Sequence, residues 1–575
     1  MTGQNKLIKG IAAAPGIAIG RVFVKKEAET LVEKKAVADI NGELDRLNHA
    51  LAQAEQELTA LKETTAEKMG EKNAEIFQAH LMFLSDPEFI AGIEQQISEE
   101  KINAEFAVQQ MVEHYVRLFA QLTSAYMRGR EADIKDVGAR IISILQNKKK
   151  IARKPAQKGI IWARNLTPSD TTQLDSTQVL GIISGEGSMT SHSSIIARSL
   201  GIPAVVGIGT DLIIDDLEGS NVIIDGNKGL VFLNPVQQLI KDYRQKLAEL
   251  KEQQSRLKQF INKKAVTRDG ERVEVAGNIG TAAEVELILN NGGEGIGLFR
   301  TEFLYMNREE LPTEDEQFVV YSEVARKMGK QKVIIRTLDI GGDKQLAYLE
   351  QLEEMNPFLG YRAIRMSLDQ PKIFKSQLKA ILRANQYGNI KLMYPMISSV
   401  EEIKEANRVL QACRTELEVE GKEFERNLEV GIMIETPAAA VIADALAQEV
   451  DFFSIGTNDL IQYTIAVDRS NEKIANLHQA YHPAVLRLIK RTIEQAHQQG
   501  IWVGMCGEAS ADQLILPFLL GAGLDEFSMN AGSILRIKAE LTKWTREEAK
   551  KITEQTLKLK NTAQIKEYLQ KISKK

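Results

Sequence analysis

Eight short apolar segments, each ending in polar residues, alternate with helix-like stretches over the last part of the chain. They are VEVAGNIG, GIGLFRTE, KVIIRTLDIGGDK, KLMYPMIS, EVGIMIETP, DFFSIGTND, IWVGMCGE and LDEFSMN. A strand of a parallel sheet is covered on both faces, so it reads as a short apolar run. Eight such strands separated by helices predict a (β/α)₈ barrel over residues 264–575, with an insertion near NPFLGYRAIR.

The polar residues at the ends of these segments indicate chemistry, because active sites of such barrels lie at the carboxyl ends of the strands. Arginines there suit phosphate or carboxylate, and two carboxylates suit Mg²⁺. A lone strand-end carboxylate is more often structural, and a lone cysteine is more often a small core residue. The whole set favours a small phosphorylated anion handled with a metal; its members are Asn278, Arg300, Arg336, Glu435, Asn458, Asp459 and Cys506.

The first part of the chain has a different pattern of apolar and charged residues. Residues 1–25 and 151–235 contain short strands, and they are similar enough in character to predict one discontinuous α/β domain. Residues 26–150 carry dense charge and a leucine-rich seam at spacings of three and four, which predicts an inserted all-α helical subdomain. A charged helix over residues 236–263 is predicted to link this region to the barrel.

The segment GEGSMTSHSSIIARSLGIPAVVG places His192 at the start of a predicted helix, among small hydroxyl residues. Thr190 or Ser191 can cap that helix, and Gly201 and Pro203 end it. Free backbone N–H groups at a helix start favour an anion, so His192 could be a nucleophile that carries a phosphate. A surface or capping role is equally open from the spacing alone.

Composition excludes several classes of protein. The 575 residues contain 73 basic and 78 acidic side chains, with no basic block, which argues against nucleic-acid binding. Two cysteines cannot form a disulfide framework, and a cytoplasmic location fits best. We expect no membrane span, because we find no apolar stretch of about 20 residues.

Together these segments resemble enzyme I of the bacterial phosphotransferase system, the phosphoenolpyruvate–protein phosphotransferase family. The resemblance covers essentially the whole chain, and the stretches that carry it are AAPGIAIG, NLTPSDTTQL, TSHSSIIARSLGIPAVVG, GIGLFRTEFLYM, RTLDIGGDK, NPFLGYRAIR, IETPAAA, SIGTNDLIQYTIAVDR, GMCGE and LDEFSMN. It implies a swivelling phosphohistidine domain, a helical subdomain that docks the carrier protein HPr, and a barrel that binds phosphoenolpyruvate and forms a homodimer.

The resemblance also implies roles for matching residues. His192 would accept the phosphoryl group, release pyruvate and pass the group to HPr, with Thr171 orienting the ring. Substrate would be held by Arg300, Arg336, Arg362, Asn458 and Arg469. Glu435 and Asp459 would carry Mg²⁺, and Cys506 would protonate the enolate carbon.

Some features depart from the family pattern or leave alternatives. The loop reads GSMTSH where relatives with GGRTSH or GGMTSH are familiar, so Ser188 could stiffen it and Met189 removes a possible phosphate-binding arginine. Pyruvate phosphate dikinase and phosphoenolpyruvate synthase share the histidine and the barrel, but only about 190 residues precede His192 and no phosphate loop is found there. The nitrogen-related form needs an extra N-terminal domain, and a non-catalytic HPr-binding scaffold would have no use for the barrel residues.

Overall fold

The structure is a computed structural model of the chain. It describes residues 6–25, 32–69, 71–120, 131–147, 158–171, 177–189, 191–209, 217–306, 308, 310–342, 346, 348, 354–471 and 473–574. The chain divides into two compact units, Met1–Lys251 and Glu252–Lys575.

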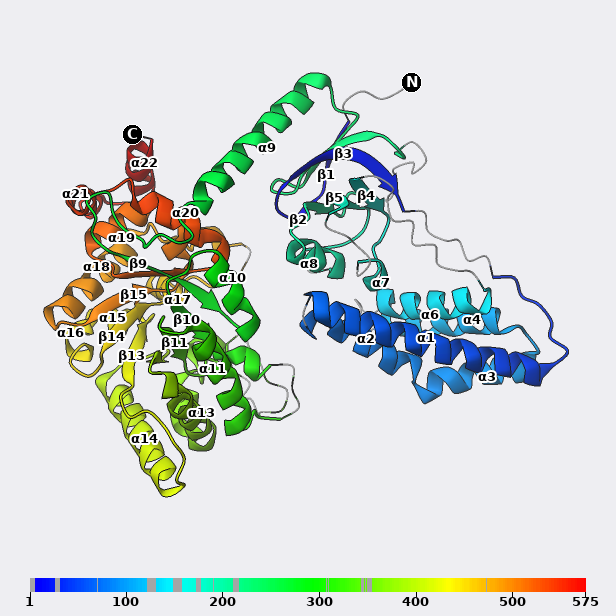
Figure 1. The fold of residues 1–575 in the computed structure, drawn as a ribbon, viewed down its shortest axis with the longest axis horizontal. Helices are drawn as coiled ribbons and strands as arrows, with labels where there is room; N and C mark the ends of the chain where they lie inside the picture. The colour runs from blue at the N-terminus through cyan, green and yellow to red at the C-terminus, as the bar shows by residue number, and fades with distance from the viewer. Residues whose placement is uncertain are drawn as a thin grey trace. The chain divides into compact units, whose positions relative to one another are not determined.

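A mixed sheet forms one part of the first unit (Figure 1). Its strand order is β1-β8-β7-β3-β4-β5-β6-β2. The strands are β1 Lys6–Lys9, β2 Ile11–Ala14, β3 Ile17–Val24, β4 Gly159–Ala163, β5 Val179–Ser184, β6 Ala204–Val206, β7 Asn221–Asp225 and β8 Leu230–Leu233. β3 pairs in parallel with β4 and antiparallel with β7, so strands from before and after the helical region share one sheet. β7 and β8 pair antiparallel and form a hairpin, with Asp225 opposite Leu230.

Helices between β3 and β4 form a bundle, drawn in blue and cyan in Figure 1. They are α1 Ile40–Met69, α2 Glu71–Leu84, α3 Pro87–Glu100, α4 Ala104–Ala120 and α6 Glu131–Leu145. Leu47, Ala54 and Leu58 of the predicted seam are fully buried, because their spacing puts them on one face of α1. In the part of the chain that the structure describes, no helix is both long and apolar enough to span a bilayer.

Among the described residues, α7, α8 and α9 belong to the sheet region. The short α7 (Pro168–Thr171) follows β4 and contacts α6, and α8 (His192–Ser199) packs on β2 and β6. The charged helix α9 (Gln237–Lys258) follows the sheet, and its Tyr243 hydroxyl donates to Asp225 Oδ2 at 3.1 Å. Burial and the nearby carboxylate raise the pKa of Tyr243 to about 12, so this hydroxyl remains protonated and fixes the start of α9 on β7.

The second unit is a closed parallel barrel, β10-β11-β12-β13-β14-β15-β16-β9. Its strands are β9 Glu274–Ile279, β10 Ile296–Arg300, β11 Val333–Arg336, β12 Ile390–Tyr394, β13 Glu429–Ile434, β14 Phe452–Ile455, β15 Trp502–Met505 and β16 Glu526–Met529. All eight predicted strands are present, and the fold class predicted from the sequence is confirmed.

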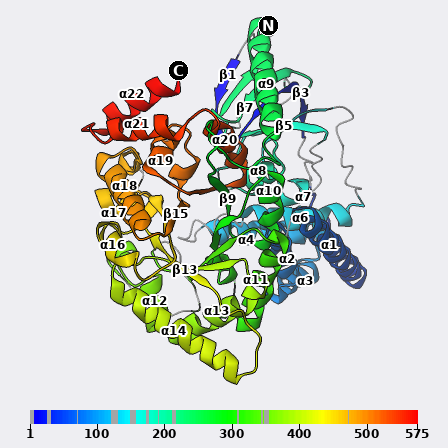
Figure 2. The same ribbon diagram turned by 60° about the vertical axis from the view of Figure 1, so that its left-hand side comes forward.

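Helices surround this barrel, and Figure 2 shows α14, α16, α18 and α19 outside the strands. The α-helices are α10 Val285–Asn290, α11 Glu314–Met328, α12 Ile364–Asp369, α13 Pro371–Ala384, α14 Val400–Val419, α15 Pro437–Val441, α16 Ala443–Leu446, α17 Thr457–Ile465, α18 Pro483–Gln498, α19 Leu516–Ala522, α20 Ala531–Leu541, α21 Arg546–Thr556 and α22 Thr562–Ser573. The insertion lies between β11 and β12 and includes a 3₁₀ turn at Pro357–Leu359.

Two apolar layers hold the barrel together. A large cluster lies between the strands and the outer helices, and a smaller one gathers Leu298, Ile334, Met393, Met433, Phe452 and Cys506. The strands are buried on both faces, which explains their continuous apolar sequences. This packing fixes the strand ends, and therefore fixes the groups attached to them.

Candidate functional site

The polar residues predicted at the strand ends occupy one end of the barrel. Arg300 and Arg336 are the last residues of β10 and β11. Glu435 and Cys506 directly follow β13 and β15, and Asp459 lies in the first turn of α17 after β14. Because parallel strands end at the same rim, residues far apart in sequence converge here.

Arg336 and Arg362 form a buried ion-pair network with acidic residues. Asp339 contacts both, with Oδ2 at 3.0 Å from Arg336 Nη1 and Oδ1 at 2.8 Å from Arg362 Nη2. Glu302 pairs with Arg336 as well. Burial would lower the pKa of both guanidinium groups, but the adjacent carboxylates outweigh it and raise the pKa above its usual value. Both arginines therefore keep their charge inside the protein.

Sequence reasoning missed Glu302 and Asp339. They follow β10 and β11 by two and three residues, in FRTEF and RTLDIGGDK. The signal was available, because acidic residues beside strand-end arginines are natural partners for them. The sequence did not show that Asp339 also pairs with Arg362, because that contact depends on where the insertion places Arg362.

Glu435 and Asp459 lie near one another in the same network. Glu435 Oε1 accepts a 2.6 Å hydrogen bond from the backbone N–H of Met396, and Asp459 Oδ2 lies 3.4 Å from Arg362 Nη2. Burial, with the negative charges of Asp459 and Asp339, raises the pKa of Glu435 to about 8, against the opposing effect of Arg336 and Arg362. Two adjacent carboxylates repel one another, and a cation bound beside them would relieve this repulsion.

Asp459 offers an oxygen for such a cation. Its Oδ1 atom is buried and has no hydrogen-bond partner among the described residues. Within those residues no group of three or more His, Cys, Asp or Glu side chains is arranged to hold a metal. Mg²⁺ usually takes only one or two protein carboxylates and completes its shell with water and substrate phosphate, so this donor set fits Mg²⁺.

Cys506 is 3% exposed and belongs to the small apolar cluster inside the barrel. Burial raises its pKa to about 11, although Arg336 and Arg300 act in the opposite direction. The group is therefore a neutral thiol near neutral pH and holds a proton. Asn278 Nδ2 donates to the Cys506 carbonyl at 2.9 Å and fixes the backbone that carries it.

Two other residues predicted at the barrel mouth, Asn458 and Arg469, make fewer contacts with the buried ion-pair network. Asn458 is half-buried, and its Oδ1 accepts from the backbone N–H of Glu508 at 3.2 Å. Arg469 follows α17 with an exposed side chain, which forms no hydrogen bond or ion pair with another described residue. The structure thus gathers Arg336, Arg362 and the acidic pair into one network but leaves Arg469 outside it.

The predicted histidine region belongs to the first unit. His192 is the first residue of α8 and Thr171 is the last of α7, but the side chains of both lie outside the described residues, as does Thr190. Ser191 occupies the capping position without making a capping hydrogen bond. Its hydroxyl donates instead to the Ser188 carbonyl at 2.8 Å, and Ser194 donates to the same oxygen at 2.7 Å.

Three family models for phosphoenolpyruvate-utilising enzymes match the chain in sequence order. The N-terminal model matches residues 9–130, the mobile-domain model matches residues 155–229, and the phosphoenolpyruvate-binding model matches residues 254–546. The third match alone covers half of the chain, and it contains the barrel mouth described above.

Relatives that match over nearly the whole chain identify which phosphoenolpyruvate-utilising family is present. The phosphoenolpyruvate-protein phosphotransferase of Priestia megaterium is 46% identical over 572 residues, covering 98% of this chain and 99% of the relative. The chain belongs to the enzyme I family. The protein of the same name from Geobacillus stearothermophilus is 47% identical over 567 residues, covering 98% of this chain and 97% of the relative. That from Bacillus subtilis (strain 168) is 46% identical over 564 residues, covering 97% of this chain and 98% of the relative.

The enzyme I family resolves the alternatives left by the sequence. These relatives, which are 46% and 47% identical and match over 98% of this chain, are named phosphoenolpyruvate-protein phosphotransferases and not dikinases. The chain is therefore a phosphoenolpyruvate–protein phosphotransferase rather than a nucleotide-using relative or a scaffold.

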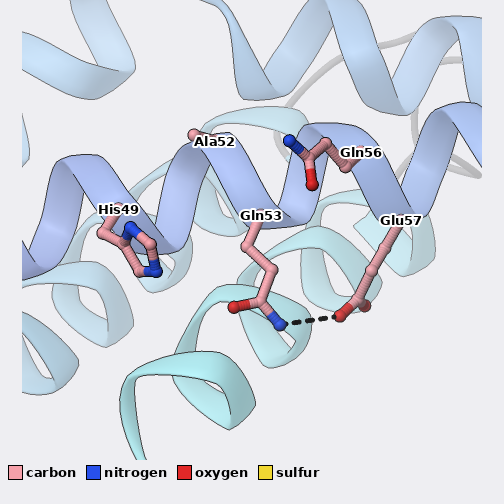
Figure 3. A pocket seen from close by; sticks show the side chains of 5 residues that line it. All are labelled: His49, Ala52, Gln53, Gln56 and Glu57. Atoms are coloured by element: carbon pink, nitrogen blue, oxygen red, sulfur yellow. Dashed lines mark hydrogen bonds between the residues drawn. The ribbon is translucent and has the colours of Figure 1, made fainter.

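In the first unit, the chain has a hollow on the surface of α1. Figure 3 shows its lining by His49, Ala52, Gln53, Gln56 and Glu57. Gln53 Nε2 donates to Glu57 Oε1 at 3.3 Å, and Glu57 also pairs with the buried Arg140 of α6. The polar groups of this hollow are the Gln53 and Gln56 amides, the His49 imidazole and the Glu57 carboxylate, which is already ion-paired with Arg140. The hollow therefore lacks the cluster of arginines and carboxylates found at the barrel mouth.

Proposed function

We propose that this protein transfers the phosphoryl group of phosphoenolpyruvate to His192, releases pyruvate, and then phosphorylates a histidine of the carrier protein HPr. This would be the first step of sugar uptake by the phosphotransferase system. The observation that carries the proposal is the convergence of buried arginines, paired carboxylates and a protonated thiol at one barrel rim.

Charge at the rim supports Mg²⁺ as the partner of an anionic substrate. Three cationic side chains, Arg300, Arg336 and Arg362, face four acidic ones, Glu302, Asp339, Glu435 and Asp459. The acidic groups are thus at least as numerous as the arginines and offset their charge, so a substrate that carries a phosphate and a carboxylate needs additional positive charge. When bound between Glu435 and Asp459, Mg²⁺ would neutralise charge on the transferred phosphoryl group.

The chain's own residues would supply binding and proton transfer. Arg300, Arg336, Arg362, Arg469 and Asn458 would hold the phosphate and carboxylate. The bridging P–O bond of phosphoenolpyruvate breaks as a P–N bond forms to His192, with Thr171 orienting the imidazole. The enolate left behind takes the proton of the Cys506 thiol at carbon and becomes pyruvate, and the thiolate then regains a proton from water.

His192 and the arginines belong to different units, so turnover requires the histidine to reach the barrel and then HPr. We assign residues 1–25 with 151–235 to the phosphohistidine domain and residues 26–150 to HPr docking. Residues 236–263 would be the linker, and residues 264–575 the substrate-binding and dimerisation domain. α9 lies in the linker and is our candidate hinge. We also place the protein in the cytoplasm, where Cys506 would remain a thiol.

Pyruvate release from phosphoenolpyruvate and Mg²⁺, without ATP or another nucleoside triphosphate, tests this function. Without HPr we expect at most about one pyruvate per enzyme chain, because each His192 is loaded once. When HPr is added, we expect continuous release. A coupled lactate dehydrogenase assay measures both phases. A requirement for ATP, or the absence of pyruvate under all conditions, would contradict the proposal.

Glu435→Gln tests the metal site. Loss of one anionic ligand is expected to raise the Mg²⁺ concentration for half-maximal pyruvate release at least ~10-fold. Calorimetric titration with Mg²⁺ should show the same weakening without turnover. Glu423→Gln, an exposed carboxylate on the same unit, is the matched control and should behave like wild type. An unchanged Mg²⁺ dependence in Glu435→Gln would remove this residue from the site.

A further inference from the structure

Asp339 occupies a position between two arginines. It follows β11 and is 2% exposed. One carboxylate oxygen lies 3.0 Å from Arg336 Nη1, and the other lies 2.8 Å from Arg362 Nη2. Arg336 belongs to β11, whereas Arg362 lies in the insertion just before α12. A single carboxylate therefore joins a strand end to a distant segment.

The backbone around Asp339 is built for this close approach. The N–H of Ala363 donates to the Ile340 carbonyl at 3.1 Å, which joins the two segments directly. Gly341 has a φ of 113°, and a Cβ atom there would lie 2.4 Å from Arg362 Cβ. Glycine is thus required for the backbone conformation and for the space that Arg362 occupies.

Without a negative charge between them, the two guanidinium groups would repel one another in a poorly solvated site. The Asp339 carboxylate offsets that repulsion, and its planar shape fixes the distance and direction of both groups. Arg362 also donates from Nη1 to the Tyr463 hydroxyl at 3.0 Å, so its far side is held as well. The pair is therefore preorganised before any ligand arrives.

We propose that Asp339 is a positioning residue for substrate binding, which sets the separation of Arg336 and Arg362 so that together they receive two anionic groups of one small ligand. This inference rests on the proposed function, in which that ligand is phosphoenolpyruvate with its phosphate and carboxylate. Asp339 acts through the arginines and does not itself touch the substrate.

Asp339→Asn separates positioning from simple anion binding. The amide has the same shape but lacks the charge, so the arginines lose their fixed spacing while becoming freer to bind a single anion. We expect kcat/KM for phosphoenolpyruvate to fall ~10–100-fold, since misplacement of about 1 Å costs on the order of 100-fold. The dissociation constant of inorganic phosphate, measured by calorimetry, should stay unchanged or decrease.

Two controls accompany this variant. Asp525→Asn makes the same chemical change in a half-buried carboxylate that bonds to His497, just before β16 at the opposite end of the barrel, and should leave both measurements unchanged. Asp339→Glu keeps the charge but lengthens the side chain, so it should not restore wild-type kcat/KM if spacing matters.

The outcomes are distinct. Wild-type kcat/KM in Asp339→Asn, recovery in Asp339→Glu, or an equal loss of phosphoenolpyruvate turnover and phosphate binding would overturn the positioning role. Failure of the proposed function has a different signature, because wild-type enzyme would then bind phosphoenolpyruvate no more tightly than inorganic phosphate in the same calorimetric titration.

Discussion

His192→Ala is expected to eliminate the phosphorylated form of the enzyme. Under the proposed function this imidazole is the acceptor of the phosphoryl group, and alanine offers no atom that can form the P–N bond. Loss of a nucleophile typically costs about 10⁴-fold or more in turnover. Enzyme incubated with ³²P-labelled phosphoenolpyruvate and Mg²⁺ should therefore retain label in the wild type and none in the variant.

His49→Ala provides the matched control for this experiment. His49 is an exposed histidine of α1 in the same unit. Under the proposed function its helix belongs to the region that docks HPr and takes no part in the loading reaction. The control should incorporate label to the wild-type level. Label on His192→Ala that resists base but is lost in acid would indicate another phosphohistidine and would contradict the assignment.

Cys506→Ala is expected to lower kcat for pyruvate formation by ~10²–10⁴-fold, the usual contribution of a positioned general acid. The raised pKa of about 11 keeps the thiol protonated at neutral pH, so the wild type begins each cycle with a proton to donate. The binding of phosphoenolpyruvate should change far less, since the arginines remain in place. Stopped-flow detection of pyruvate and calorimetric titration of phosphoenolpyruvate measure the two quantities.

Cys413→Ala is the control for the thiol. Cys413 is also fully buried, and burial raises its pKa to about 12, but it lies in α14 outside the barrel rim. It should retain wild-type kcat. If Cys506→Ala also retained it, the proton would have to come from another group, and Cys506 would be only part of the apolar cluster.

The candidate site was partly visible in the sequence. Arg336, Glu435 and Cys506 could be found because each ends an apolar run, and a barrel places such ends on one rim. Asp339 could not be found in this way. Its importance depends on contact with Arg362, which arrives from an insertion whose path no local pattern specifies.

The first unit shows the same division. The three-and-four spacing along α1 predicted its buried face, because helical periodicity depends only on near neighbours. The capping prediction was incomplete, since Ser191 stands at the start of α8 but its hydroxyl bonds to the Ser188 carbonyl. A serine hydroxyl at a helix start can hydrogen-bond either to the backbone of the helix or to a carbonyl of the preceding loop, and the geometry of the loop decides which bond forms.

By itself, the sequence determined the order of the strands and helices, the barrel, and the polar residues at its strand ends, because these follow from short-range patterns of apolar and polar residues. Tertiary structure alone decided which charges meet: Asp339 between Arg336 and Arg362, a buried Asp459 oxygen without a partner among the described residues, and a thiol held protonated by burial. The physical reason is that ion pairing and desolvation depend on distances in space between residues far apart in the chain.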